Sequence, residues 1–315
     1  MNILITGASG NLGSQVARHL MSGPHRLYLA VHKTPLSSDL VDHANVSIRH
    51  IDLARPETLP QACTGVDCIV HLAGVLFAPL PERFLPKTNV GYVRDLVAAA
   101  KAAGVRKFIL ASFPHVEGET TPDHPAVGRL DAAPRVIHFR TRLEAERVLI
   151  EATRNGSMIA VVFRAGIVYG KGIKLIESAR WMLRRHLLAV WRKPTWAHLI
   201  ALPDFLSALQ AAIELENADG IYQVCDDTPV TIQDFLDRLA DHWQLSKPWR
   251  LPAWMFRFAG VSCEAASLLF HMPALLNRDI VRAGMTSCVA DTSRMKRELL
   301  PVLAYPNIEQ GLMLL

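Results

Sequence analysis

Hydrophobic positions in the first half of the chain form short apolar runs that alternate with longer segments of helical periodicity. The runs predict strands at residues 3–6, 26–31, 46–51, 68–72, 107–111 and 158–164, and the periodic segments predict helices at 12–21, 90–103 and 141–154. Strands that alternate with helices are typical of a parallel sheet covered on both faces. The pattern therefore predicts an α/β fold built on a doubly wound parallel sheet.

Glycines mark the junction between the first predicted strand and the first predicted helix. Residues 3–13 read ILITGASGNLG, with Gly7, Gly10 and Gly13 three residues apart. In a strand–turn–helix unit the first glycine permits the tight turn, the second lets the backbone approach a pyrophosphate, and the third lets the helix pack on the strand. The amides at the helix N-terminus then face the phosphates. We therefore predict a Rossmann-type site for NAD(P) here.

His32 and Lys33 follow the second predicted strand, beside the expected position of the adenosine ribose. An Asp or Glu at this place would accept a hydrogen bond from the 2′-hydroxyl of NAD. A carboxylate would repel a 2′-phosphate, whereas Lys33 and a chargeable His32 would attract it. NADP is therefore the favoured cofactor, with NAD as the alternative if both residues are ordinary solvated side chains.

Residues that follow the third and fourth predicted strands extend this site, because small side chains at strand ends let a flat cofactor lie along the sheet. The cofactor residues predicted up to this point are Gly7, Ser9, Gly10, Asn11, Leu12, Gly13, His32, Lys33, Asp52, Leu53, Leu72, Ala73 and Gly74. As an alternative, Gly74 alone could be a strand breaker.

The regular alternation stops near residue 166. We predict a Rossmann domain for NAD(P) over residues 1–165 and a smaller C-terminal α/β substrate lobe over 166–315, with some segments of the lobe returning to the first domain. The stretch 181–196 mixes Trp with Arg and Lys, which is typical either of a pocket wall or of a packed amphipathic helix. The apolar segment 251–272 is interpreted as a core or dimer helix, with a peripheral membrane contact as the alternative.

Composition and charge narrow the class of protein and the kind of partner. Hydrophobic residues make up 50% of the chain and charged residues 20%, which is typical of a globular protein. The net charge of +5 is mild and the basic residues are dispersed, so a small-molecule substrate is favoured and no nucleic acid is expected. Five cysteines without metal-ligand spacing predict free thiols, a cytoplasmic location and no metal site. No signal peptide or membrane span is predicted, and we expect a monomer or homodimer.

The chain resembles the extended and atypical branches of the short-chain dehydrogenase/reductase superfamily, which include NAD-dependent epimerases and dehydratases, hydroxysteroid-dehydrogenase-like proteins and NmrA-like proteins. The turn TGASGNLG matches the TGxxGxxG pattern of that superfamily in full. Further matches are DL at 52–53, HLAG at 71–74, the segment 88–112, FRAGIVYG at 163–170, PDFLSAL at 203–209 and GIYQVCDDTPVTIQDF at 220–235. The resemblance adds Arg142, Ala165, Gly166 and Ile167 to the expected cofactor contacts.

The same resemblance implies a catalytic Ser or Thr, a Tyr, and a Lys four residues after that Tyr. Alignment on the pair Ala145–Glu146 places His138 at the Tyr position and Arg142 at the Lys position. None of the five tyrosines has a Lys four residues later. Ser112 falls one residue before the position of the catalytic hydroxyl, which Phe113 occupies.

His138, Arg142 and Ser112 are therefore the candidate catalytic residues. An imidazole titrates near neutrality, so His138 could act as a general acid, although a nearby Arg142 would favour its neutral form. Arg142 could hold the cofactor ribose or its phosphates but cannot titrate. The competing interpretation of His138 is a helix residue that merely faces the cleft.

His115, Glu117 and Glu119 follow the fifth predicted strand. We interpret residues 113–119 as a flexible solvated loop, with an acid or metal group as the alternative.

The expected function is that of an atypical oxidoreductase that uses NADPH to reduce a small, hydrophobic carbonyl or unsaturated compound. The first alternative is a catalytically silent, NmrA-like redox sensor that binds NAD(P) and acts through a partner. The second is a sugar epimerase or dehydratase. The reactions of such enzymes need a competent base to begin the oxidation.

Overall fold

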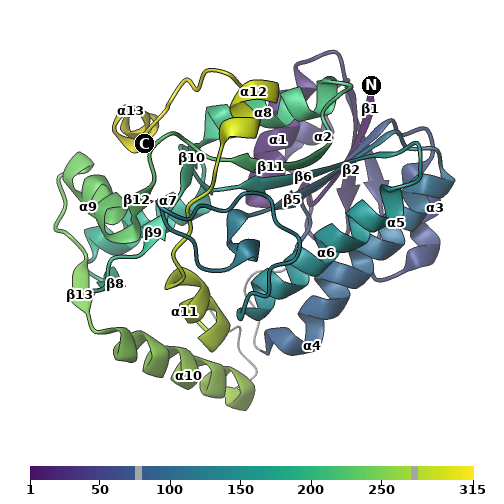
Figure 1. Cartoon of the computed structure of the whole chain (residues 1–315). Helices are drawn as coiled ribbons and strands as arrows, with labels where there is room; N and C mark the ends of the chain where they lie inside the picture. The colour runs from purple at the N-terminus through teal and green to yellow at the C-terminus, as the bar shows by residue number, and fades with distance from the viewer. Residues whose placement is uncertain (75–79, 271–275) are drawn as a thin grey trace.

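The computed structural model describes residues 1–74, 80–270 and 276–315 and contains a sheet of seven parallel strands (Figure 1). In spatial order these are β11 (Gly220–Val224), β6 (Ile159–Ala165), β5 (Lys107–Ser112), β4 (Cys68–His71), β1 (Asn2–Thr6), β2 (Arg26–Val31) and β3 (Val46–His50). The order reverses at β1, since β2 and β3 lie on one side of it and β4, β5 and β6 on the other. The predicted Rossmann-type doubly wound sheet is confirmed.

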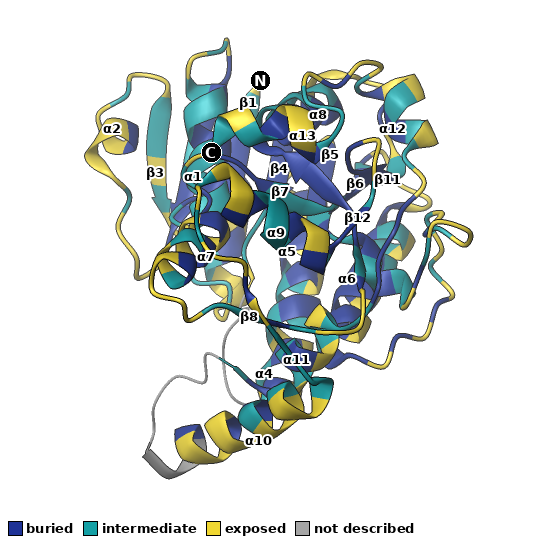
Figure 2. Ribbon diagram, turned by 90° about the vertical axis from the view of Figure 1, so that its left-hand side faces the viewer, coloured by how far each residue is buried: buried dark blue, intermediate teal, exposed yellow. Residues whose placement is uncertain are grey.

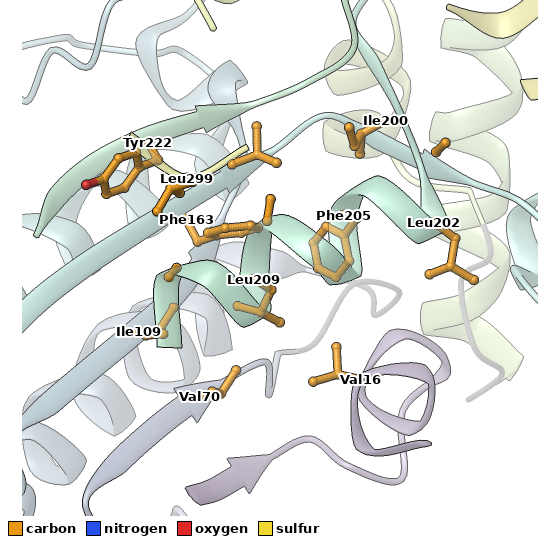
Figure 3. Packing of buried hydrophobic residues seen from close by; sticks show 14 of the residues in the cluster. Val16, Val70, Ile109, Phe163, Ile200, Leu202, Phe205, Leu209, Tyr222 and Leu299 are labelled. Carbon is orange, nitrogen blue, oxygen red and sulfur yellow. The ribbon is translucent and has the colours of Figure 1, made fainter. Parts of the chain in front are cut away.

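Helices cover both faces of the sheet because successive strand residues point to opposite sides. Ile3 and Ile5 of β1 belong to one hydrophobic cluster and Leu4 belongs to the other. The first cluster lies under α1 (Asn11–Met21) and α8 (Leu202–Glu214), and Figure 3 shows Phe205 and Leu209 of α8 among its side chains. The second lies under α3 (Leu59–Cys63), α5 (Tyr92–Ala102) and α6 (Ile137–Thr153).

The remaining elements are short or lie outside the seven-stranded sheet. Near the first domain they are α2 (Ser38–Val41), α4 (Pro81–Leu85) and the π-helical turn η2 (Pro86–Gly91), with the 3-10 turns η1 (Pro56–Thr58) and η3 (Pro114–Glu117). Beyond β6 they are β7 (Ile167–Tyr169), α7 (Lys174–Arg184), β8 (Ala189–Trp191), β9 (Trp196–Ala197), β10 (Leu199–Ala201), β12 (Val230–Thr231), α9 (Ile232–His242), β13 (Trp249–Leu251), α10 (Ala253–Phe270), α11 (Arg278–Gly284), α12 (Ser293–Glu298), α13 (Ile308–Gly311) and η4 (Leu312–Leu314).

Three small sheets build the C-terminal part, namely the pairs β7 and β10, β9 and β12, and β8 and β13. One segment of this part rejoins the large sheet, since β11 pairs in parallel with β6 from Gly220 opposite Val161 to Val224 opposite Ala165. The boundary at residue 165 itself stays a prediction.

Helix α10 differs from the core helix that its apolar sequence predicted. Trp254 and Phe258 are 64% and 69% exposed. Figure 2 shows exposed residues along much of α10. The helix is attached through its opposite side, where the buried Gly260 faces Val281 of α11 and Glu264 pairs with Arg278 at 2.7 Å. The interpretation as a core helix is therefore wrong, because hydrophobicity in sequence does not state which helix face is covered. A dimer helix and a peripheral membrane contact stay predictions. In the described part of the chain no helix has the length and apolar character needed to cross a bilayer.

Candidate functional site

A cleft of about 870 Å³ opens at the carboxyl ends of the central strands. Ten of the predicted cofactor residues line it, namely Gly7, Ser9, Gly10, His32, Lys33, Asp52, Leu53, Leu72, Ala73 and Gly74. This edge of a doubly wound sheet, at the strand where the order reverses, is where such folds bind ligands.

The turn between β1 and α1 can adopt its conformation only because Gly7 and Gly13 carry no Cβ. Gly7 has a φ of +76°, and a Cβ there would lie 2.7 Å from the amide nitrogen of Ala73. A Cβ on Gly13 would collide with the carbonyl oxygen of Gly7, so this glycine allows α1 to begin close to the turn. The turn and the first amides of α1 therefore fit a dinucleotide pyrophosphate.

The ends of β2 and β3 place basic side chains at one end of the cleft. His32 Nε2 lies 3.5 Å and Arg55 Nε lies 3.6 Å from the same carboxylate oxygen of Asp52. Lys33 is exposed and has no ion pair in the part of the chain that the structure describes. This end of the cleft therefore carries one cation that no nearby carboxylate neutralises.

Sequence reasoning missed several residues that line the cleft, and the complete set of these is Thr6, Ala30, Val31, Thr34, Ile51, Ala54, Arg55, Thr88 and Tyr92. Thr6, Val31 and Ile51 are the last residue of a strand or follow a strand directly, so the predicted strand ends could have identified these three. Arg55, Thr88 and Tyr92 belong to other segments, and no local pattern indicates that these segments reach the cleft.

Other predicted cofactor residues do not line the cleft. Asn11 links two segments: its side-chain amide donates to the carbonyl of Gly172 at 2.6 Å and its oxygen accepts from the Lys174 amide at 2.8 Å. Gly166 packs against the carbonyl of His198 and the Cys225 sulfur. Leu12, Gly13, Arg142, Ala165 and Ile167 are also absent from the lining. Cofactor contact by these residues stays a prediction.

Arg142 on α6 reaches the edge of the cleft beside β4. One of its Nη atoms lies 3.1 Å from the point where Gly74 would carry a Cβ. The residue is 8% exposed, and burial lowers the pKa of its guanidinium to about 10. Its hydrogen bond to Asn89 Oδ1 is long, at 3.4 Å, and its Nε has no partner in the described structure. The side chain is therefore a buried cation with unused donors.

His138 lies one helical turn before Arg142. Its ring stacks on Phe113 with centroids 6.0 Å apart, and Phe113 also contacts the Phe139 ring edge-on at 5.6 Å. Burial, and secondarily the charge of Arg142, lowers the pKa of His138 to about 4. The imidazole is therefore neutral at pH 7, so it can donate or accept a hydrogen bond but is not a charged acid.

Ser112 is turned away from this pair. Its hydroxyl donates to Glu146 Oε1, and the carboxylate of Glu146 also accepts from Nε and Nη2 of Arg164, the latter at 2.6 Å. All three residues are buried. In the structure Ser112 thus joins β5 to α6, and its predicted catalytic role stays a prediction.

Glu117 completes this ionic network. It accepts from Arg164 Nη1 at 2.5 Å, from Gln223 at 3.0 Å and from the Gly128 amide at 2.7 Å, and its side chain is 4% exposed. A solvated loop is therefore the wrong interpretation of residues 113–119. Glu117 compensates the buried charge of Arg164, a pairing between distant segments that local sequence does not reveal.

Comparisons with known proteins agree with this geometry. The family model described as the NAD dependent epimerase/dehydratase family matches residues 3–212. The 3 beta-hydroxysteroid dehydrogenase/Delta 5-->4-isomerase of Monkeypox virus is 21% identical, with 90% of this chain and 88% of that protein covered. The 2-alkyl-3-oxoalkanoate reductase of Stenotrophomonas maltophilia (strain K279a) is 28% identical, with 76% and 74% covered.

A solved structure shares the fold over the whole chain. MoeE5 in complex with UDP-glucuronic acid and NAD superposes with a TM-score of 0.77 at 18% sequence identity, with 100% of this chain and 97% of that chain covered. The sheet order, the glycine turn and the family match lead to one conclusion. The chain belongs to the NAD dependent epimerase/dehydratase family, within the extended short-chain dehydrogenase/reductase architecture.

Proposed function

We propose that the protein is an NADP-preferring oxidoreductase that reduces a small, apolar carbonyl or unsaturated compound. The observation that carries this proposal is a cleft with a complete dinucleotide turn at β1 and a buried cation with unused donors, Arg142, at the β4 side. A bound nicotinamide supplies the hydride, so the chain has to bind, orient and polarise the substrate. The free cysteines agree with the cytoplasmic location we propose.

The preference for NADP is argued from the β2 end of the cleft. Lys33 is a cation without an ion pair among the described residues, and Arg55 adds a second cation beside it. Asp52 shares its charge between His32 and Arg55 rather than leaving it free to repel a phosphate. These side chains would hold the 2′-phosphate of NADP, while the glycine turn would hold the pyrophosphate of either cofactor.

We propose roles for the two polar groups on α6. Neutral His138 donates a hydrogen bond to the substrate oxygen, and Arg142 holds the substrate in position. Neither residue titrates near pH 7 in the folded protein, since the pKa of His138 is about 4 and that of Arg142 about 10. The proton that completes the reduction therefore comes from water. Ser112 acts as a positioning residue through Glu146.

The apolar substrate class is supported by the aromatic surroundings of His138 and by two relatives. The names of these relatives refer to a hydroxysteroid and to an oxoalkanoate. A sugar epimerase or dehydratase is the alternative favoured by MoeE5, but α6 offers no Tyr and Lys to start an oxidation. A catalytically silent redox sensor is the other alternative, and it is favoured by the absence of the Tyr and Lys from α6.

Oxidation of NADPH, followed by absorbance with a panel of aliphatic and aromatic ketones, aldehydes and enones, tests the proposal. We expect turnover with at least one apolar member, and tighter binding of NADP⁺ than of NAD⁺. His138→Ala should lower kcat about tenfold or more, because one hydrogen bond to a developing charge is lost. Binding of NADPH without turnover would favour the sensor, and unchanged turnover in H138A would refute the role of the imidazole.

A further inference from the structure

The guanidinium of Arg142 is a buried polar group at the edge of the cleft. Among the described residues its Nε is enclosed and has no acceptor, and its contact with Asn89 is 3.4 Å long. Buried donors in native proteins are almost always satisfied, because an unsatisfied one costs free energy of desolvation without return. A ligand in the cleft would supply an acceptor to the Nη side of the guanidinium, which lies beside Gly74.

Glu146 keeps Arg142 charged without occupying its donors. The carboxylate lies one turn further along α6, and its charge raises the pKa of Arg142 against the larger lowering caused by burial. Its oxygens already accept from Ser112 and from Arg164. Arg142 therefore remains a cation at neutral pH with donors that face no carboxylate in the described structure, which suits an anionic acceptor.

The position of Arg142 in the cleft separates it from the charges of a dinucleotide. Lys33 lies at the end of β2 and the glycine turn at the end of β1, while Arg142 abuts Gly74 after β4. In the sheet β4 lies on the opposite side of β1 from β2. A dinucleotide that runs from β2 across β1 has its phosphates met by the first two groups. Arg142 is then available to the substrate, which approaches the nicotinamide end of the cofactor.

Apolar surface lies next to this cation. The neutral ring of His138, one helical turn before Arg142, stacks on Phe113, and Phe139 contacts Phe113 edge-on. We propose that Arg142 binds a carboxylate of the substrate and that the substrate is an oxo acid whose apolar part packs on Phe113 and His138. This inference rests on the proposed reductase function and names the class of its substrate.

The test measures binding rather than turnover. Octanoate and octanamide have the same chain and differ in charge, and neither offers a ketone for reduction. Their affinities are measured by calorimetry on the full chain saturated with NADP⁺. We expect octanoate to bind roughly ten- to a hundredfold more tightly than octanamide, the effect of charge-assisted hydrogen bonds to a desolvated guanidinium.

Two variants of Arg142 test whether this residue causes the preference for octanoate. Arg142→Met should remove it, and Arg142→Lys, which keeps the charge without the planar fork, should retain part of it. Arg140→Met is the matched control, since Arg140 is exposed on α6 and should keep the full preference. The Kd of NADP⁺ is measured for every variant, so that an effect on the binding of octanoate is separated from an effect on the binding of the cofactor.

Equal affinity for octanoate and octanamide in the unaltered protein would overturn the proposal, as would a preference that survives in R142M. A large loss of NADP⁺ affinity in R142M with the preference intact would assign Arg142 to the cofactor instead. These measurements need no turnover. Failure of the reductase proposal therefore appears in the carbonyl panel, and failure of the Arg142 assignment appears in the ratio of the two affinities.

Discussion

Single side chains decide which dinucleotide the cleft prefers. Lys33 is exposed at the end of β2 and pairs with no carboxylate in the described residues, whereas His32 and Arg55 share Asp52. An unpaired cation at this position binds a 2′-phosphate more favourably than a cation in an ion pair, because the ion pair would first have to break. Lys33 is therefore the residue on which the cofactor preference should depend most.

We predict that Lys33→Glu lowers the preference for NADP⁺ over NAD⁺ about tenfold or more, because attraction of the 2′-phosphate becomes repulsion. Dissociation constants of both cofactors, measured by fluorescence titration, check the prediction. Glu57→Lys is a suitable control, since Glu57 is an exposed residue in η1 that does not line the cleft. An unchanged ratio in K33E would contradict the assignment of NADP.

At the scale of elements, the start of α6 depends on a residue from a distant helix. The helix has no side-chain cap of its own at Val136 and no acidic residue in its first turn. Asp279 of α11 takes that place: its carboxylate accepts from the Ile137 amide at 3.0 Å and from the His138 amide at 3.3 Å. The C-terminal part thus holds the turn that carries His138.

Asp279→Ala should lower the free energy of unfolding by about 1 kcal/mol, the usual value of a helix cap, and should also raise the KM of the best carbonyl substrate. The second effect is expected because the uncapped turn positions His138 less firmly. Urea unfolding and steady-state kinetics measure the two quantities.

Thr231→Ala provides the control for this prediction. Thr231 caps α9 by accepting from the Asp234 amide at 3.0 Å, and it does not line the cofactor cleft. Thr231→Ala should lower the free energy of unfolding by a similar amount without a change in KM. Equal kinetics in D279A and T231A would show that the cap on α6 has no influence on the site.

At the scale of the whole molecule, buried histidines make stability depend on pH. Burial lowers the pKa of His71 to about 3 and that of His198 to about 4, from an ordinary value of 6.5. Burial is the main cause for His198, whose Nδ1 accepts from the Ala290 amide at 3.1 Å, whereas the hydrogen bond from Nε2 to the Asp226 carbonyl at 3.0 Å acts against this lowering. In the folded protein these rings therefore resist protonation.

We predict that the free energy of unfolding falls as pH decreases from about 6.5 toward 4, because the unfolded chain protonates four histidines that stay neutral in the folded chain, His71, His115, His138 and His198. Asp226, whose pKa burial raises to about 8, acts in the opposite direction and offsets only part of this effect. Each buried histidine contributes a slope of up to about 1.4 kcal/mol per pH unit in this window. Urea unfolding between pH 7 and 5 measures it. His198→Asn should reduce the slope even though it also lowers stability, and an unchanged slope would contradict the prediction.

The sequence by itself determined the parts of this protein that depend on neighbouring residues. Six of the seven strands of the large sheet follow from apolar runs, and the cofactor turn follows from the spacing of Gly7, Gly10 and Gly13, because strand burial and turn geometry are local properties. Ten predicted residues that line the cleft lie in that turn or directly after a strand.

Only the tertiary structure decided which distant groups meet. It paired Glu117 with Arg164, capped α6 with Asp279, brought Arg55 to the cofactor cleft and left Arg142 with unused donors. It also left one face of α10 exposed. These features arise from contacts between segments far apart in the chain, and local periodicity carries no information about such contacts. The burial that lowers the pKa values of His138 and Arg142 is therefore a property of the folded molecule.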